Sequence, residues 1–188
     1  MDYSYYKKLL ESMLTQKRYY HSLCVADEAK RLAVKYGADE NKAFLAGLLH
    51  DITKNIIEEE QLQMFSDFDI IPDSITKKSL KLWHAVTGAA YIKNILEIDD
   101  EEIISAVRYH TTAKKNMNLL QKILYLADFT SLDREYPDVD VMRKKVDISL
   151  DEAMKYALSY TITELVEKQV QIHPDTMEAY NQVMEEKI

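Results

Sequence analysis

Apolar residues recur at three- and four-residue spacings along most of the chain, which is the periodicity of amphipathic helices. The first such segment follows Ser4, and a second covers about residues 18–36. Gly37 then occupies a position that commonly ends a helix, and Asp39 is suited to cap a third helix that carries an apolar run to Leu49. The pattern therefore predicts three helices up to Leu49.

The same periodicity continues to the other end of the chain. It predicts further helices at residues 56–65, 79–96, 100–111, 118–126 and 149–170, and a last one after Pro174. Asn118 is suited to cap its helix, and Ser149 followed by Glu152 has the spacing of a capping box. Irregular backbone is expected between the helices, at residues 67–74, 113–117 and 131–138.

Few residues in this sequence favour tight turns. Gly and Pro occur only three times each among 188 residues, so a fold with many strands is disfavoured. The length suits one domain with a sizeable core and is short for two, and no linker, repeat or low-complexity segment is visible. We therefore predict an all-α fold in which residues 1–188 form a single helical domain.

Acidic side chains outnumber basic ones, with 32 Asp and Glu against 24 Lys and Arg, which gives a formal charge of −8. An acidic surface repels nucleic acid, so we expect no nucleic-acid partner, although a locally positive pocket can still bind a small phosphorylated ligand. The single cysteine, Cys24, excludes an intrachain disulfide and lies on an apolar helix face, which is typical of a core residue. The amino terminus lacks the pattern of a secretory signal, and the longest apolar stretch, residues 43–49, is too short to span a membrane. These features predict a cytoplasmic protein without membrane contact.

Two ionisable residues, His50 and Asp51, close the apolar run of the third predicted helix. Ala46 and Gly47 lie one turn earlier, where their small side chains let another helix approach closely. Burial of a carboxylate is costly without a cation or several hydrogen bonds, and a metal ion would supply that compensation. Asp128 repeats the pattern in another apolar helix, where it binds metal, caps the following loop or pairs with an Arg such as Arg134.

Four of the five histidines lie on separate predicted helices with apolar neighbours three or four residues away, namely His21, His50, His84 and His110. A single histidine in such a setting is more often a hydrogen-bonded core residue than a metal ligand. Four of them, together with two carboxylates in apolar helices, indicate a metal site in the core, built from several helices. The fifth histidine, His173, stands at a helix break without metal-binding neighbours.

The order of these residues resembles the ligand series of the His-Asp (HD) domain metal-dependent phosphohydrolases. Local segments resemble the YqeK-like branch, the bacterial symmetrical diadenosine tetraphosphate hydrolases, at residues 18–23, 50–54, 82–88, 109–112, 125–129 and 134–139. The similarity extends from about residue 5 to 185. One departure is Ala113, where the family is expected to place Gly, and it concerns the substrate preference more than the metal site.

The resemblance implies an all-α HD-domain bundle with two divalent metal ions. One ion would be held by His21, His50, Asp51 and Asp128, and the other by the bridging Asp51 with His84 and His110. The last three residues would form the catalytic set, where the ions activate water for attack on phosphorus. Imidazole and carboxylate ligands suit iron, manganese or zinc, and the resemblance favours iron.

Four side chains are candidates for binding substrate phosphates. Lys54 follows His50 by four residues, and Arg18 precedes His21 by one turn. Arg134 could donate two parallel hydrogen bonds to one phosphate, or it could pair with a nearby carboxylate. Thr111 could donate its hydroxyl to the substrate, or it could merely cap a helix. Each of these residues also has a purely structural interpretation, such as a solvated Lys near a helix end.

The resemblance implies hydrolysis of diadenosine tetraphosphate to two ADP, a nucleotide substrate and a homodimer. One alternative is another HD-type nucleotide phosphatase or phosphodiesterase. The alarmone-hydrolase branch is disfavoured, because residues 52–55 lack the acidic pair that it places after His-Asp. A second alternative is a nucleotide-sensing module that binds metal without catalysis, although a purely structural site would leave fewer coordination positions open.

Overall fold

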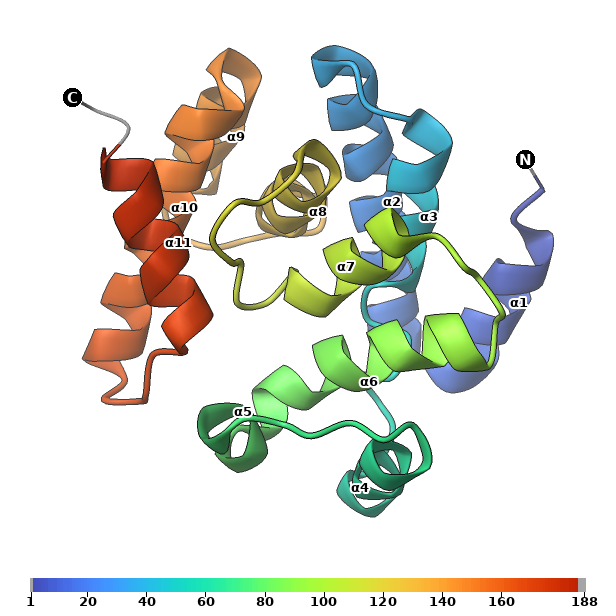
Figure 1. Cartoon of the computed structure of the whole chain (residues 1–188). Coiled ribbons are helices and arrows are strands. Elements are labelled where there is room, and N and C mark those ends of the chain that lie inside the picture. The colour runs from blue at the N-terminus through green and yellow to red at the C-terminus, as the bar shows by residue number, and fades with distance from the viewer. Residues whose placement is uncertain (1, 186–188) are drawn as a thin grey trace.

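The computed structural model describes residues 2–185, and within them it contains eleven α-helices and no β-strand, which confirms the all-α prediction. In chain order the helices are α1 (Ser4–Met13), α2 (Gln16–Tyr36), α3 (Glu40–Leu49), α4 (Glu58–Asp67), α5 (Ser74–Lys78), α6 (Leu80–Asn94), α7 (Glu101–Tyr109), α8 (Leu119–Thr130), α9 (Val139–Ile148), α10 (Leu150–Glu167) and α11 (Pro174–Glu185). Figure 1 shows α1 and α11 on opposite sides of the molecule.

Helix α8 lies at the centre of the fold, between α2 and α3 on one side and α9, α10 and α11 on the other (Figure 1). It packs against α2, α3, α7, α9 and α10. Ile123, Leu124 and Leu126 on this helix are completely buried, as expected for a helix that is apolar on most sides. One continuous set of buried apolar side chains runs from Leu10 in α1 to Val183 in α11 and supports our proposal of a single domain.

The helix ends predicted from capping residues are present. Gly37 ends α2 in the left-handed conformation with φ 76°, and the Asp39 side chain accepts hydrogen bonds from the first backbone N–H groups of α3. Asn118 and Gln121 form a reciprocal capping box at the start of α8. Ser149 accepts a hydrogen bond from the backbone N–H of Glu152 at the start of α10. These ends were predictable because a cap depends on residues within one turn.

Two helices have no counterpart in the sequence-based expectations. Helix α5 is only five residues long, and Asp73 caps it at the end of a stretch expected to be irregular. Helix α9 follows the predicted loop at residues 131–138, and only Met142 and Val146 of its side chains are fully buried. Two apolar residues four positions apart are too few to form a recognisable stripe.

Helices α2 and α3 cross at very short range. A Cβ atom added to Gly47 would lie 2.7 Å from the Cα atom of Ala26, so the two backbones touch at this point. This contact brings His21 on α2 next to His50 at the end of α3, with their ring centroids 5.2 Å apart. The small residue singled out in the sequence thus positions two of the candidate ligands.

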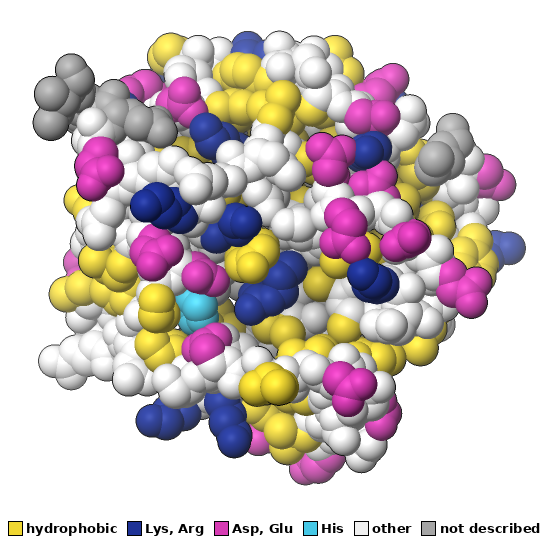
Figure 2. Space-filling view, in the orientation of Figure 1, with side chains coloured by type: hydrophobic (Ala, Val, Ile, Leu, Met, Phe, Trp, Pro, Cys, Tyr) yellow, Lys and Arg dark blue, Asp and Glu magenta, His cyan; other side chains and the backbone are white. Residues whose placement is uncertain are grey.

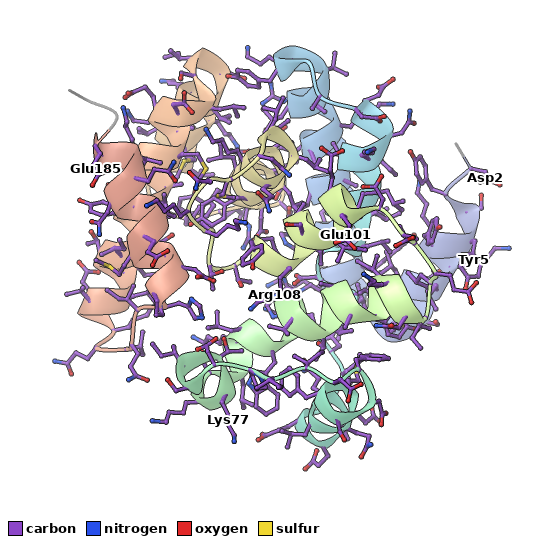
Figure 3. The ribbon with its side chains drawn as sticks, in the orientation of Figure 1. Asp2, Tyr5, Lys77, Glu101, Arg108 and Glu185 are labelled. Atoms are coloured by element: carbon purple, nitrogen blue, oxygen red, sulfur yellow. The ribbon has the colours of Figure 1, made fainter. Side chains whose placement is uncertain are left out.

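Charged side chains of both signs are mixed on the face of the molecule that Figure 2 draws. Figure 2 shows Lys and Arg interspersed with Asp and Glu over the visible face, and no continuous basic stripe crosses it. In Figure 3, Glu101 and Arg108 mark the first and last turns of α7, an arrangement of charges that complements the helix dipole. Among the described residues, no helix combines the length and the apolar character needed to cross a membrane.

Candidate metal centre

Five helices supply the six candidate ligands, and the structure brings all six into one buried region. His21 lies on α2, His84 on α6 and Asp128 on α8, while His50 with Asp51 follows α3 and His110 follows α7. The four histidines and Asp51 are each at most 4% exposed. The Asp128 side chain is more open, at 21% exposed. The fold thus brings together, in one region, residues that lie more than a hundred positions apart in the sequence.

Asp51 stands between two pairs of histidines. Its Oδ2 atom is 3.3 Å from Nε2 of His50 and 4.0 Å from Nε2 of His21. Its Oδ1 atom is 3.1 Å from Nε2 of His84 and 3.8 Å from Nε2 of His110. Two clusters therefore share one carboxylate, and in each of them the three ligand atoms lie within 4.8 Å of one another. This is the geometry of two adjacent cation sites with a common bridging residue.

Two of the imidazole rings are held by the helices they terminate. The Nδ1 atom of His50 lies 2.7 Å from the carbonyl oxygen of Gly47, and Nδ1 of His110 lies 2.7 Å from that of Val107. A carbonyl only accepts, so Nδ1 carries the proton and a neutral ring keeps the Nε2 lone pair directed at the centre. His50 Nε2 is buried without any hydrogen-bond partner. An orphaned nitrogen of this kind fits a metal ligand, because buried polar atoms are otherwise paired.

The electrostatics keep the acids charged and two of the histidines neutral. Burial lowers the pKa of His50, and it lowers the pKa of His84 to about 4. Burial alone would raise the pKa of Asp51, but its electrostatic interactions with His50 and the other surrounding histidines hold it well below its usual value. Neutral imidazoles around an ionised carboxylate are the protonation states that bind divalent metals. The donor set therefore fits metal ions.

Asp128 lies beside the first cluster and outside both groups of three. Its Oδ1 atom is 2.9 Å from Nε2 of His21 and 3.9 Å from Nε2 of His50. The same oxygen accepts a hydrogen bond from the guanidinium of Arg134, whose Nε also donates to the Asp128 carbonyl. Burial alone would raise the pKa of Asp128, but the charge of Arg134, the hydrogen bond with His21 and the nearby imidazoles together hold it well below its usual value. Asp128 thus pairs with Arg134, as one of its three interpretations expects, and it also lies beside the first histidine cluster, where a metal ligand would be needed.

Three predicted phosphate-binding cations reach this centre. Arg18 donates to Asp51 Oδ2 at 2.8 Å, and Nζ of Lys54 is 3.1 Å from both ring nitrogens of His84. Burial lowers the pKa of Lys54, an effect opposed by the negative charge of Asp51. Arg134 completes the set. The fourth candidate, Thr111, follows His110 and keeps a buried hydroxyl without a hydrogen-bond partner among the described residues.

One residue that contacts the candidate ligands, Asp133, was not predicted from the sequence to belong to the site. Asp133 accepts from Nδ1 of His21 at 2.8 Å and from the Ser131 hydroxyl at 2.8 Å, so it fixes the ring of His21. Burial alone would raise the pKa of Asp133, but the hydrogen bond from His21, together with the Ser131 hydroxyl and the charge of Arg134, lowers it below its usual value. Asp133 lies in a loop without periodicity, and only the tertiary structure shows which of its neighbours it contacts.

The centre opens toward a hollow of about 650 Å³. Its lining contains Lys17, Arg18, Tyr20, His21, Leu132, Asp133, Arg134, Glu135 and Tyr136. Two of the candidate phosphate-binding residues therefore face solvent-accessible space directly beside the first histidine cluster. A polyanionic ligand can approach from this side.

Ala113, the one departure from the family pattern, has a left-handed backbone with φ 57°. This conformation costs an L-residue roughly 1–2 kcal/mol and explains why glycine is expected at this position. The Ala113 side chain is completely buried, and burial of its methyl group stabilises the fold by about 0.8 kcal/mol, which offsets part of the conformational cost. The loop after His110 therefore adopts at Ala113 the left-handed turn that a glycine would favour.

Comparisons with known proteins agree with this geometry. The HD domain family matches residues 18–133. The symmetrical bis(5'-nucleosyl)-tetraphosphatase of Halalkalibacterium halodurans is 37% identical over 180 residues, covering 96% of each chain. The protein of the same name from Bacillus subtilis is 34% identical over 172 residues and 92% of each chain.

A solved structure shows the same fold. It is the crystal structure of a "predicted HD superfamily hydrolase involved in NAD metabolism" from Clostridium acetobutylicum, which superimposes with a TM-score of 0.95 at 35% sequence identity. The match covers 100% of this chain and 99% of the other. This chain therefore belongs to the HD-domain phosphohydrolases.

Proposed function

We propose that this protein hydrolyses diadenosine tetraphosphate symmetrically to two ADP, with the help of two divalent metal ions. The observation that carries the proposal is the pair of histidine clusters sharing Asp51, found in a chain that matches two symmetrical tetraphosphatases over nearly its full length. The substrate is taken from the names of those relatives, and the two-cluster geometry supplies the place for the chemistry.

His21, His50, Asp51 and Asp128 would hold the first ion, and Asp51, His84 and His110 the second. Ions bound there would supply Lewis acidity, which polarises phosphoryl oxygens and lowers the pKa of an attacking water. Imidazole nitrogens and carboxylate oxygens suit iron, manganese and zinc alike. We propose iron, on the resemblance of the sequence motifs to the tetraphosphatase branch.

The side chains of the protein would bind and orient the phosphate chain. Three cationic side chains contact the carboxylates and imidazoles of the centre, namely Arg18, Lys54 and Arg134. Their positive charges would bind the phosphate oxygens of a ligand that enters from the hollow of about 650 Å³. An Arg can donate two parallel hydrogen bonds to one phosphate and fix its orientation. The unpartnered hydroxyl of Thr111 offers one further donor beside His110.

Symmetrical cleavage requires that the central phosphoric anhydride lies at the centre. The bond broken is then the one between the two middle phosphates, water adds to one of the two phosphorus atoms, and an ADP leaves on each side. The two ADP halves of the substrate must therefore extend away from the centre in opposite directions. This condition separates the proposal from a phosphatase that removes a terminal phosphate.

The test is anaerobic incubation of purified, iron-loaded protein with diadenosine tetraphosphate, followed by chromatographic separation of the products. We expect ADP as the sole product. AMP with ATP would overturn symmetrical cleavage while retaining a phosphohydrolase. No product from a sample with confirmed bound metal would favour another HD-type phosphatase or phosphodiesterase, to be sought with other phosphate esters, or a nucleotide-sensing module.

Two further expectations remain predictions. The resemblance suggests a homodimer, which light scattering coupled to gel filtration measures directly. A cytoplasmic location is expected from the composition and is measured by cell fractionation.

A further inference from the structure

A second hollow adjoins the candidate metal centre at Asp128 and Arg134. It has a volume of about 280 Å³, just below the roughly 300–1,000 Å³ typical of small-molecule pockets. Its lining consists of Asp128, Phe129, Arg134, Tyr136, Tyr160 and Glu164. We call it the aromatic hollow. Arg134 and Tyr136 also line the large hollow of about 650 Å³, so the two spaces meet at these residues.

Three aromatic rings from separate parts of the chain surround this space. Phe129 comes from α8, Tyr136 from the following loop and Tyr160 from α10. The ring centroid of Tyr160 lies 5.3 Å from that of Tyr136 and 6.4 Å from that of Phe129. The Tyr136 hydroxyl donates to the Phe129 carbonyl at 3.1 Å, which fixes that ring. All three rings are half-buried, in contrast to the neighbouring Tyr125, which is 1% exposed.

We propose that the aromatic hollow binds one nucleobase of the substrate, a purine stacked against Tyr160 and Tyr136, with the adjoining phosphates at Arg134. Stacking on aromatic rings suits any nucleobase because every base presents a π-face. Glu164 also lines the hollow. One of its carboxylate oxygens accepts a hydrogen bond from Lys168, and its second oxygen can accept one from an exocyclic amino group such as that of adenine.

The position of Arg134 connects this subsite to the chemistry. Its guanidinium contacts Asp128 in the candidate metal centre, and Arg134 is also one of the residues that line the aromatic hollow. A phosphate held by Arg134 would therefore lie close to both the candidate metal centre and the aromatic rings. The assignment rests on the proposed function for the identity of the ligand, and it goes further by naming where one base of that ligand lies.

The experiment compares the binding of ADP with that of inorganic pyrophosphate, measured by calorimetry on metal-loaded protein. The variants are Tyr160→Ala, which removes the ring, and Tyr160→Phe, which keeps it. Tyr156→Ala is the matched control, because Tyr156 lies one turn earlier on α10, is also half-buried and does not line the hollow. Circular dichroism melting checks that each variant folds.

We expect Tyr160→Ala to weaken ADP binding about tenfold, the effect typical of losing one stacked base, and to leave pyrophosphate binding unchanged. Tyr160→Phe and Tyr156→Ala should bind ADP as the unmodified protein does. Unchanged ADP binding in Tyr160→Ala would overturn the proposal. An equal loss for ADP and pyrophosphate would overturn it too, because it would reveal a structural role for the ring.

The outcome is separable from that of the proposed function. Release of ADP from diadenosine tetraphosphate by the unmodified protein tests the reaction, whereas the difference between ADP and pyrophosphate tests the subsite. If the reaction fails while ADP binding still depends on Tyr160, the hollow is a nucleotide site and the symmetrical cleavage is rejected. If the reaction succeeds without any dependence on Tyr160, only the subsite is rejected.

Discussion

Asp51 is the residue on which both histidine clusters depend, because each of its oxygens faces a different pair of imidazoles. Replacement by Ala removes the shared ligand while the four histidines remain. We expect Asp51→Ala to abolish turnover and release metal, with helical content largely intact. Metal analysis, product chromatography and circular dichroism on one preparation measure all three. Activity like that of the unmodified protein would refute a bridging role for this carboxylate.

Lys54 offers a test of phosphate binding that leaves the candidate ligands in place. Its ammonium lies 3.1 Å from the His84 ring and is directed at the centre. We expect Lys54→Ala to raise KM for diadenosine tetraphosphate about tenfold, the equivalent of one charge-assisted hydrogen bond of roughly 1.5 kcal/mol, with a smaller change in kcat. Steady-state kinetics measure both values, with the exposed Lys77→Ala as control. If neither KM nor kcat changes, Lys54 has only a structural role.

The buried His84 makes the stability of the metal-stripped protein depend on pH. The folded pKa of His84, about 4, lies below the ordinary histidine pKa of 6.5, so the unfolded chain binds more protons between these pH values. The free energy of unfolding should therefore fall as pH drops from 6.5 toward 4, by up to about 3 kcal/mol from this residue. The lowered pKa of Asp51 adds a loss only at lower pH, and the raised pKa of His21 acts in the opposite direction.

Urea denaturation at pH 7, 6, 5 and 4.5 measures this dependence. The control is His84→Gln, which cannot take up the proton and should show a flatter profile over the same range. A profile in the unmodified protein that matches that of His84→Gln would contradict the assignment of a neutral, buried His84.

At the scale of the helices, the contact between α2 and α3 sets the distance between two candidate ligands. A methyl group at position 47 would lie 2.7 Å from the Ala26 backbone and 2.9 Å from the Val25 carbonyl oxygen, and neither group can rotate away. We expect Gly47→Ala to separate the helices and to lower the free energy of unfolding by about 1–3 kcal/mol, the usual cost of overpacking. It should also weaken metal binding at the His21 and His50 cluster.

Gly88→Ala is a matched control for this substitution. An added Cβ at Gly88 on α6 would meet the hydroxyl of Thr53 at 3.4 Å, which a small side-chain shift accommodates. Thermal denaturation and metal stoichiometry should therefore be close to those of the unmodified protein. Equal effects of the two substitutions would show that close helix approach at Gly47 is not the cause.

For the whole molecule, the continuous core supports one cooperative unit. Buried apolar side chains connect α1 with α11 through the central α8, without a second core of comparable size among the described residues. We expect scanning calorimetry of the metal-free chain to give a single transition, with equal calorimetric and van't Hoff enthalpies. Two separable transitions would refute the single-domain proposal, and limited proteolysis would then locate the boundary.

Local patterns in the sequence sufficed for most helices and for the inventory of candidate ligands. Periodicity and capping residues act within one or two turns, so the ends at Gly37, Asp39 and Asn118 could be predicted. His21, His50 and Asp51 stood out because polar residues in apolar helices need a compensating partner. The resemblance to the HD family rested on the same residues and was confirmed by the family match.

Other features were decided only by the tertiary structure, because they depend on contacts between residues distant in the chain. Three contacts join separate helices or loops in this way. The two oxygens of Asp51 face different histidine clusters, His21 donates a hydrogen bond to Asp133, and three aromatic rings line one hollow. No local pattern records such distances. By itself the sequence thus determined most of the helices and the kind of chemistry, whereas three-dimensional packing decided how the groups face one another.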